Sequence, residues 1–396
     1  MKKSLFILAT AAIALASCNN DVKIAENKTL GNQPQEIAFF PLAQKPARML
    51  APAARAAVHG TTMPDQTLYV AAYQAAATSP ATAGNYFGKT SFMKNYKGGT
   101  ASASDDVWGG NPARYYPLSP ATINFLAVTG KESAVDIGNH VTFNATNYAE
   151  DVTVAYTSTN SYAKTSQVDI MYGVGQGVVS QSGNGLSFAG GGTTSAENIA
   201  MTFNHALALL NFQVKAATGQ AGLIQVNSIT VNGASYNGTL LVKNANYAAT
   251  TTAATTQPKI QWTPASAEAN VVTGISNYTL TTDFYPTNAD NDAANWANLM
   301  IIPSDTYDAT DNSIDDPIQR GFNSFTINYT VKAQTGFAAQ TYEYTYWPSG
   351  TVDTPTNVQE GKIYTYKITL TLHEIRIEPV VTDWTDGTGS PANVNI

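Results

Sequence analysis

The chain has 396 residues, 12% of them charged, and carries 21 lysines and arginines against 28 aspartates and glutamates, so its formal net charge is −7. A negative chain of this kind is a poor partner for nucleic acid, so no nucleic acid partner is expected. Cys18 is the only cysteine. Internal disulfides and metal sites built from several thiolates are therefore excluded, and a large core must stabilise the fold.

The first residues have the pattern of a bacterial lipoprotein signal. Lys2 and Lys3 precede an apolar run, residues 5–15, that is too short to span a bilayer, and Leu15-Ala16-Ser17-Cys18 follows. Residues 1–17 are therefore predicted to be a signal peptide. The Cys18 sulfur is the predicted lipid attachment site, since a thiolate nucleophile forms the thioether to diacylglycerol, and the acyl chains would then anchor the protein to the outer membrane.

Residues 18–55 are predicted to form a lipidated N-terminal propeptide that contains one removable strand. Arg48 and Arg55 lie behind this strand in accessible, Ala/Pro-rich chain that a trypsin-like protease could cut. Cleavage after Arg55 leaves Ala56 as the new N-terminus, and cleavage after Arg48 leaves Met49. Both sites stay open, with Arg55 preferred. The apolar candidates in the removable strand are Ile37, Phe39, Phe40 and Leu42.

Beyond residue 65, apolar and polar residues alternate with a period of two in many segments, separated by Gly, Asn, Pro and Thr. This pattern is typical of antiparallel strands with one buried face. Long alternation of this kind implies sheets that pack in pairs, so the predicted fold class is all-β, with two β-sandwich domains. The clearest segments are 68–72, 152–156, 210–214, 325–331, 342–346 and 364–372.

A glycine-rich stretch, residues 183–192, suggests a domain boundary near 195. The predicted domains are then an N-terminal β-sandwich, residues 56–195, and a C-terminal β-sandwich, residues 196–396. Residues 216–222 are a competing boundary, or a loop between two strands. A change of phase near Asn227 and Ser228 predicts a β-bulge, and residues 245–270 are expected to form a long surface connection.

Residues that could carry chemistry form no recognisable motif. The four histidines are scattered, so no metal and no cofactor is predicted. His205 shares parity with the apolar residues around it, so we interpret it as a buried, hydrogen-bonded strand residue. Adjacent aspartates do not make a glycosidase pair, and the chain is not expected to be an enzyme. A tyrosine stripe, 342/344/346, could stack on sugar rings, although this spacing is more typical of the inner face of a sandwich.

Several segments, each weak alone, recur in a specific order. In chain order they are the lipobox ending at Cys18, 36–39 (EIAF), 55–58 (RAAV), 63–64 (MP) with 68–73 (LYVAAY), 115–117 (YYP), 123–127 (INFLA), 203–207 (FNHAL), and 361–366 (GKIYTY) closing on 383–384 (DW). In this order they resemble the fimbrillin family, the type V pilin precursors of Gram-negative anaerobes.

The resemblance implies export as a lipoprotein and two β-sandwich domains of transthyretin-like (Greek-key) topology. It also implies that an arginine-specific protease removes the N-terminal strand. A strand of about eight residues covers about 26 Å of sheet edge, so its loss would bare a row of unpaired backbone groups and an apolar groove. A strand from another subunit could fill that groove by β-augmentation.

The first functional hypothesis is a structural subunit of a cell-surface fimbria that is polymerised by donor-strand exchange with other subunits and supports adhesion to a host or bacterial surface. Stalk, anchor and tip positions stay open. The candidate donor strand is the C-terminal segment with Ala392, Val394 and Ile396, and Ile375, Ile377 and Val380-Val381 offer a second segment. The alternative is an uncleaved, monomeric outer-surface lipoprotein that binds glycan or host protein through Trp108, Tyr115 and Tyr116.

Overall fold

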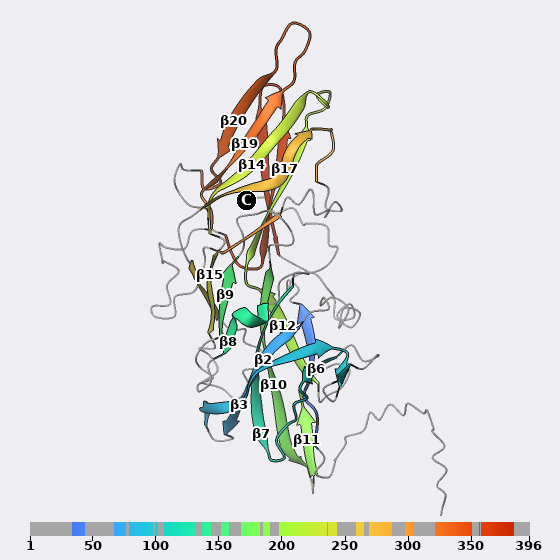
Figure 1. The fold of residues 1–396 in the computed structure, drawn as a ribbon, viewed down its shortest axis with the longest axis vertical. Coiled ribbons are helices and arrows are strands. Elements are labelled where there is room, and N and C mark those ends of the chain that lie inside the picture. The colour runs from blue at the N-terminus through green and yellow to red at the C-terminus, as the bar shows by residue number, and fades with distance from the viewer. Residues whose placement is uncertain are drawn as a thin grey trace, which may run out of the picture.

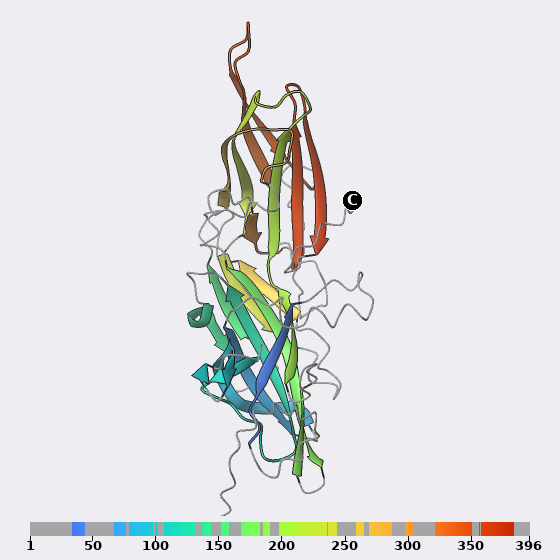
Figure 2. The ribbon, with the colours of Figure 1, turned by 90° about the vertical axis from the view of Figure 1, so that its right-hand side faces the viewer.

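The computed structural model is almost entirely β-structure, drawn out along one axis, with a barrel at one end and a sandwich at the other (Figures 1 and 2). No helix in the described part of the chain is long and apolar enough to cross a membrane. The all-β fold class is thus confirmed. The structure describes residues 34–43, 67–76, 79–97, 100–101, 107–131, 137–143, 152–157, 168–182, 185–190, 198–235, 237–243, 259–264, 269–286, 298–303, 321–350, 356 and 358–383.

The barrel is a sheet that closes on itself. Its strands follow the order β11-β10-β12-β1-β6-β3-β2-β7. The last strand in this order, β7, also pairs with β10 along eleven residue pairs, and this pairing closes the sheet. The strands are β1 (Ala38–Ala43), β2 (Leu68–Ala76), β3 (Ser79–Lys94), β6 (Trp108–Asn111), β7 (Ala121–Lys131), β10 (Asp169–Ser182), β11 (Gly185–Ala189) and β12 (Ile199–His205).

Both faces of the strands around this closure are buried. Phe125 and Met171 point into the barrel, whereas their chain neighbours Leu126 and Tyr172 point outward. A second, four-stranded sheet, in the order β16-β15-β9-β8, supplies apolar residues to this outer core. Its strands are β8 (Val141–Phe143), β9 (Val152–Thr157), β15 (Asn237–Lys243) and β16 (Lys259–Pro264), and a short 3-10 helix, η2 (Ile137–His140), precedes β8.

The other end of the molecule is a sandwich of two four-stranded sheets, as predicted, whereas the predicted N-terminal sandwich is instead a barrel, because β7 pairs with β10. One sheet has the order β18-β13-β21-β22 and the other β17-β14-β19-β20, with one continuous core between them. The strands are β13 (Ala208–Ala216), β14 (Ile224–Ala234), β17 (Ala269–Thr279), β18 (Asn298–Ile301), β19 (Ser324–Val331), β20 (Gln340–Tyr346), β21 (Lys362–Leu370) and β22 (Ile375–Asp383); the two-residue strands β4 (Tyr96–Lys97) and β5 (Thr100–Ala101) form a separate small hairpin.

The predicted boundary near residue 195 does not coincide with a division of the strands. Strand β12, which lies after it, pairs with β1 and β10 of the barrel, and β15 pairs with β9. The chain therefore enters the sandwich only after β12 and returns to the barrel end for β15 and β16. Residues 259–264 were expected to be surface connection, yet they form β16, because Trp262 is fully buried in the outer core of the barrel.

Local predictions from alternation agree with the structure. All six of the segments with the clearest alternation lie in strands or overlap them by most of their length. The register of β14 against β19 shifts between Val226 and Ser228, which confirms the predicted bulge. Residues 217–223 form turns that join β13 in one sheet of the sandwich to β14 in the other, so they link two layers.

Candidate functional site: the slot of the N-terminal strand

Strand β1 fills a slot inside the barrel wall, between β12 and β6 (Figure 2, darkest blue). It runs parallel to β12, with Phe39 opposite Ile199 and Ala43 opposite Phe203, and antiparallel to β6, with Phe39 opposite Trp108. The segment before it is held as well, since the Ile37 amide donates to the Arg114 carbonyl at 2.7 Å. Neighbouring chain thus hydrogen-bonds this segment on both sides.

This arrangement corrects one expectation. The sequence predicted that the removable strand covers an edge of a sheet, but β1 is internal, because it pairs with β12 on one side and with β6 on the other. Loss of β1 would therefore bare two rows of backbone groups that face each other across the slot, one on β12 and one on β6.

The inward side chains of this segment are deeply buried. Ile37 and Phe39 are both fully buried, and Pro41 is buried as well. The Phe39 ring packs edge-on against Phe92, with centroids 4.6 Å apart, and against Phe125, at 5.1 Å. Phe39 is therefore the main apolar anchor of the strand. The side chains of Phe40 and Leu42 lie outside the described part of the structure.

The sequence analysis did not identify β6, the strand that lines the other side of the slot. Trp108 is fully buried in β6, and a Cβ atom on its neighbour Gly109 would lie only 2.1 Å from the Tyr96 carbonyl oxygen. Glycine is thus required for the close backbone approach that completes this side of the slot. The signal was present in the sequence as an aromatic residue followed by two glycines, Trp108-Gly109-Gly110.

Trp108 and Tyr116, which the alternative hypothesis placed in glycan-binding loops, belong to the barrel core. Trp108 is 0% exposed and Tyr116 is 2% exposed, whereas Tyr115 is 44% exposed. The amide of Tyr116 also donates to the Gln35 carbonyl, just before β1. Two of the three proposed aromatics are therefore unavailable to a ligand, since a buried ring offers no face for sugar stacking.

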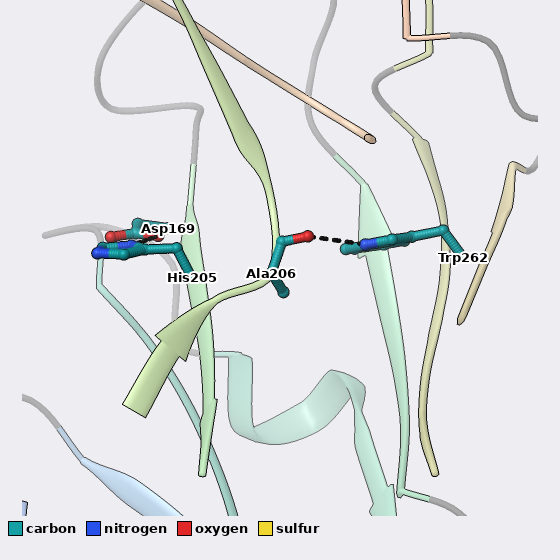
Figure 3. A network of polar contacts seen from close by, with 4 residues as sticks. All are labelled: Asp169, His205, Ala206 and Trp262. Atoms are coloured by element: carbon teal, nitrogen blue, oxygen red, sulfur yellow. Dashed lines mark hydrogen bonds and ion pairs between the residues drawn. The ribbon is translucent and has the colours of Figure 1, made fainter. Parts of the chain in front are cut away.

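Beyond the end of the slot that faces the sandwich, two polar contacts fix the point where the chain passes from barrel to sandwich (Figure 3). His205 Nδ1 lies 2.9 Å from Asp169 Oδ1, and the His205 side chain is 3% exposed, which confirms the interpretation of a buried, hydrogen-bonded strand residue. Trp262 Nε1 donates to the Ala206 carbonyl at 2.8 Å. Both contacts satisfy buried polar groups, and they give this region a structural role.

The second candidate donor segment is β22, at one edge of the sandwich. Its only neighbour among the described strands is β21. Ile375 and Ile377 are partly buried and pack on the sandwich core, and Val380 is 8% exposed. The other predicted sites lie outside the described residues; these are Cys18, Arg48, Met49, Arg55, Ala56, Ala392, Val394 and Ile396.

Within the described part of the chain, no group of three or more His, Cys, Asp or Glu residues could hold a metal ion. The feature that stands out is a strand held in a slot of a closed sheet, with an all-β sandwich attached. These features define a class of β-proteins whose sheets can bind an extended segment by backbone pairing.

The sequence matches the fimbrillin-like family over residues 54–384, so the chain belongs to that family. It is accordingly a structural, non-enzymatic protein of the fimbrial class, as the sequence predicted. None of the curated proteins matches the chain.

Among solved structures, a fimbrial protein from Bacteroides vulgatus is similar at 16% identity and a TM-score of 0.46, over 88% of this chain and 99% of that one. The tip fimbrial protein Mfa3 from Porphyromonas gingivalis is 12% identical with a TM-score of 0.36, over 89% of this chain and 100% of that one. A fimbrial assembly protein from Parabacteroides distasonis is 11% identical with a TM-score of 0.34, over 89% and 97%. At these values the likenesses carry no argument about the chain.

Proposed function

We propose that this protein is a subunit of a cell-surface fimbria that is exported as a lipoprotein anchored through Cys18, is cleaved after Arg55 by an arginine-specific protease, and is polymerised by donor-strand exchange in support of adhesion. The observation that carries the proposal is the internal position of β1. A strand paired on both sides, and joined to the rest of the protein only through residues 44–66, leaves a ready slot once that connection is cut.

A strand that replaces β1 in the slot must meet two requirements. A replacement strand must supply apolar side chains at every second position, for the sites of Ile37, Phe39 and Pro41, and must accept five residue pairs with β12. The C-terminal segment meets the spacing with Ala392, Val394 and Ile396, although these side chains are smaller than those they would replace. A smaller side chain in the Phe39 site would leave a cavity and weaken the link.

Strand β22 matches the slot more closely. Residues 36–41 read EIAFFP and residues 374–379 read EIRIEP, so both segments have Glu, Ile, a second apolar residue and Pro at the same spacing. Aligned in this way, Ile375, Ile377 and Pro379 take the places of Ile37, Phe39 and Pro41. The proline is tolerated in β22 because an edge strand has one side without ladder bonds. Donation of β22, alone or with the tail that follows it, is therefore part of the proposal.

Disulfide cross-linking between cleaved subunits tests the proposal. Phe40 lies opposite Ala200 of β12, and Glu378 aligns with Phe40, so a subunit with Glu378→Cys should form a disulfide with one carrying Ala200→Cys. If the tail is the donor, Asn395→Cys should react with Ala200→Cys instead. Cleavage removes Cys18, so the introduced residues are the only thiols.

Two controls make the outcome decisive. An acceptor carrying Val272→Cys, which is exposed on β17 away from the slot, should not react. An acceptor in which Arg48 and Arg55 are both replaced by Ala should keep β1 in place and should not react at Ala200→Cys. If neither donor cross-links to the cleaved acceptor, or if the uncleaved acceptor reacts equally well, the proposal of strand exchange is wrong. A blocked, lipidated Cys18 on protein sheared from cells would support the uncleaved lipoprotein instead.

A further inference from the structure

The four edges of the sandwich are not equally protected against pairing with another chain. Natural edge strands avoid such pairing by being short, by carrying prolines or charges, or by bulges. Strand β18 has four residues, and β22 contains Pro379 and the ion pair of Arg376 with Glu378, at 3.0 Å. Strand β17 shows register shifts against β14 and a residue with positive φ, Asn277.

Strand β20 is the least protected of the four. It pairs with β19 in an unbroken register from Gln340 opposite Val331 to Tyr346 opposite Phe325, with no proline, no lysine and a single charge, Glu343. Its only neighbour among the described strands is β19. The hairpin of these two strands projects from the distal end of the molecule in both views (Figures 1 and 2). A regular, nearly uncharged edge in this position is open to a further strand.

The side chains beside this edge are also incompletely covered. Tyr342, Tyr344 and Tyr346 lie opposite Tyr329, Ile327 and Phe325, so they face the inside of the sandwich. The rings of Tyr329 and Tyr342 stack at 5.4 Å, and those of Phe325 and Tyr346 lie 5.2 Å apart. Even so, Tyr342 and Tyr344 remain 42% and 41% exposed. A strand added to β20 would carry side chains over these rings.

We infer that the occupant of this edge is a second copy of β20, paired antiparallel about a two-fold axis at Tyr344. In this register Tyr342 lies opposite Tyr346 and Tyr344 lies opposite its own copy, so the inner face becomes a ladder of tyrosine pairs. On the outer face Glu343 lies opposite Thr345, so the only charged residue of the strand does not meet its copy. The strand is thus complementary to itself in both apolar and charged positions.

This contact joins subunits side by side and is separate from strand exchange at the β1 slot. One pair of seven-residue edges makes a weak contact, but a fimbria carries many copies along its length. Many weak contacts between two aligned filaments act together through effective concentration, so the inferred consequence is the lateral bundling of fimbriae. The inference itself concerns the contact between two chains and holds for the unpolymerised protein.

The register can be tested with a matched pair of substitutions at Thr345, measured on the full-length chain carrying Cys18→Ser by sedimentation equilibrium. Thr345→Glu places two Glu–Glu pairs across the two-fold axis and should weaken the dimer. Thr345→Lys places two Glu–Lys pairs there and should strengthen it. Both variants lose the same hydrogen bond between Thr345 and Thr326, at 3.0 Å, so a difference between them does not arise from its loss.

We expect the two dissociation constants to differ by at least about tenfold at low salt, and the difference to shrink in high salt as the charges are screened. Independently, Tyr344→Cys should give disulfide-linked dimers at a level well above Val272→Cys on the opposite edge, β17. Equal dissociation constants for the two Thr345 variants, or equal cross-linking by the two cysteine variants, would overturn the inference. Gel ladders from strand exchange should be unchanged in the Thr345 variants, which separates this contact from the proposed function.

Discussion

Truncation of Phe39 is the most direct test of how β1 is held. Its ring is fully buried between Phe92 and Phe125, at centroid distances of 4.6 and 5.1 Å. Replacing a buried phenylalanine by alanine costs about 3–5 kcal/mol, and each lost aromatic pair accounts for about 0.5–1.5 kcal/mol beyond buried area. We therefore expect Phe39→Ala to lower the free energy of unfolding of the precursor by about 3–5 kcal/mol.

The assay is urea denaturation of the full-length precursor followed by tryptophan fluorescence, since Trp108 lies opposite Phe39 in the slot. Phe337→Ala is the matched control, because Phe337 is 78% exposed and its removal should change stability by about 0.5 kcal/mol or less. The reasoning is refuted if Phe39→Ala costs less than about 1 kcal/mol, or if the two variants are destabilised equally.

Three further predictions concern export, maturation and pH. Cys18→Ala should leave the precursor unlipidated, because this sulfur is the proposed attachment point of the acyl anchor; labelled palmitate incorporated at the wild-type level would contradict this. Arg55→Ala should make uncleaved precursor accumulate at the cell surface, and N-terminal sequencing that finds Met49 would move the cleavage site to Arg48. Burial raises the pKa of Tyr73 to about 12, above its usual value of 10, so the folded state holds this proton more tightly than the unfolded chain. The stability contributed by neutral Tyr73 should be complete below about pH 10 and fall as the pH rises toward 12, and urea midpoints that stay level across this range would exclude the effect.

Alternation along the chain predicted the strands that bury one face, because a half-buried strand shows which of its residues face a core, but it missed β16. It was not sufficient to predict the neighbours of each strand. Phe125 and Leu126 are both buried, one inside the barrel and one beneath the covering sheet, so residues 125–128 of β7 (FLAV) read as a continuous apolar run. No local pattern in such a run indicates that β7 closes a barrel with β10.

The sequence predicted the strand that fills the slot but not the strands on either side of it. Of the four apolar residues assigned to the removable strand, Ile37 and Phe39 are buried in this segment, and local spacing is enough to pick out such residues. The parallel partner β12 follows more than 150 residues later, and no local pattern in the sequence indicates so distant a pairing. The sequence therefore identified the strand that fills the slot, and the structure was needed to show its two walls.

The continuity of β12 with β13 determines how the molecule carries load. Only Ala206 and Leu207 separate the two strands, so the backbone passes through a single bend from the barrel wall into the centre of the sandwich. A pull along the strand in the β1 slot is parallel to β12, and the ladder bonds between them resist it in shear, all at once. Detachment then requires the simultaneous loss of several bonds, and its rate is set by that single high barrier. In the proposed strand exchange, the number of residues that the donor strand pairs with β12 therefore sets how long the joint withstands force.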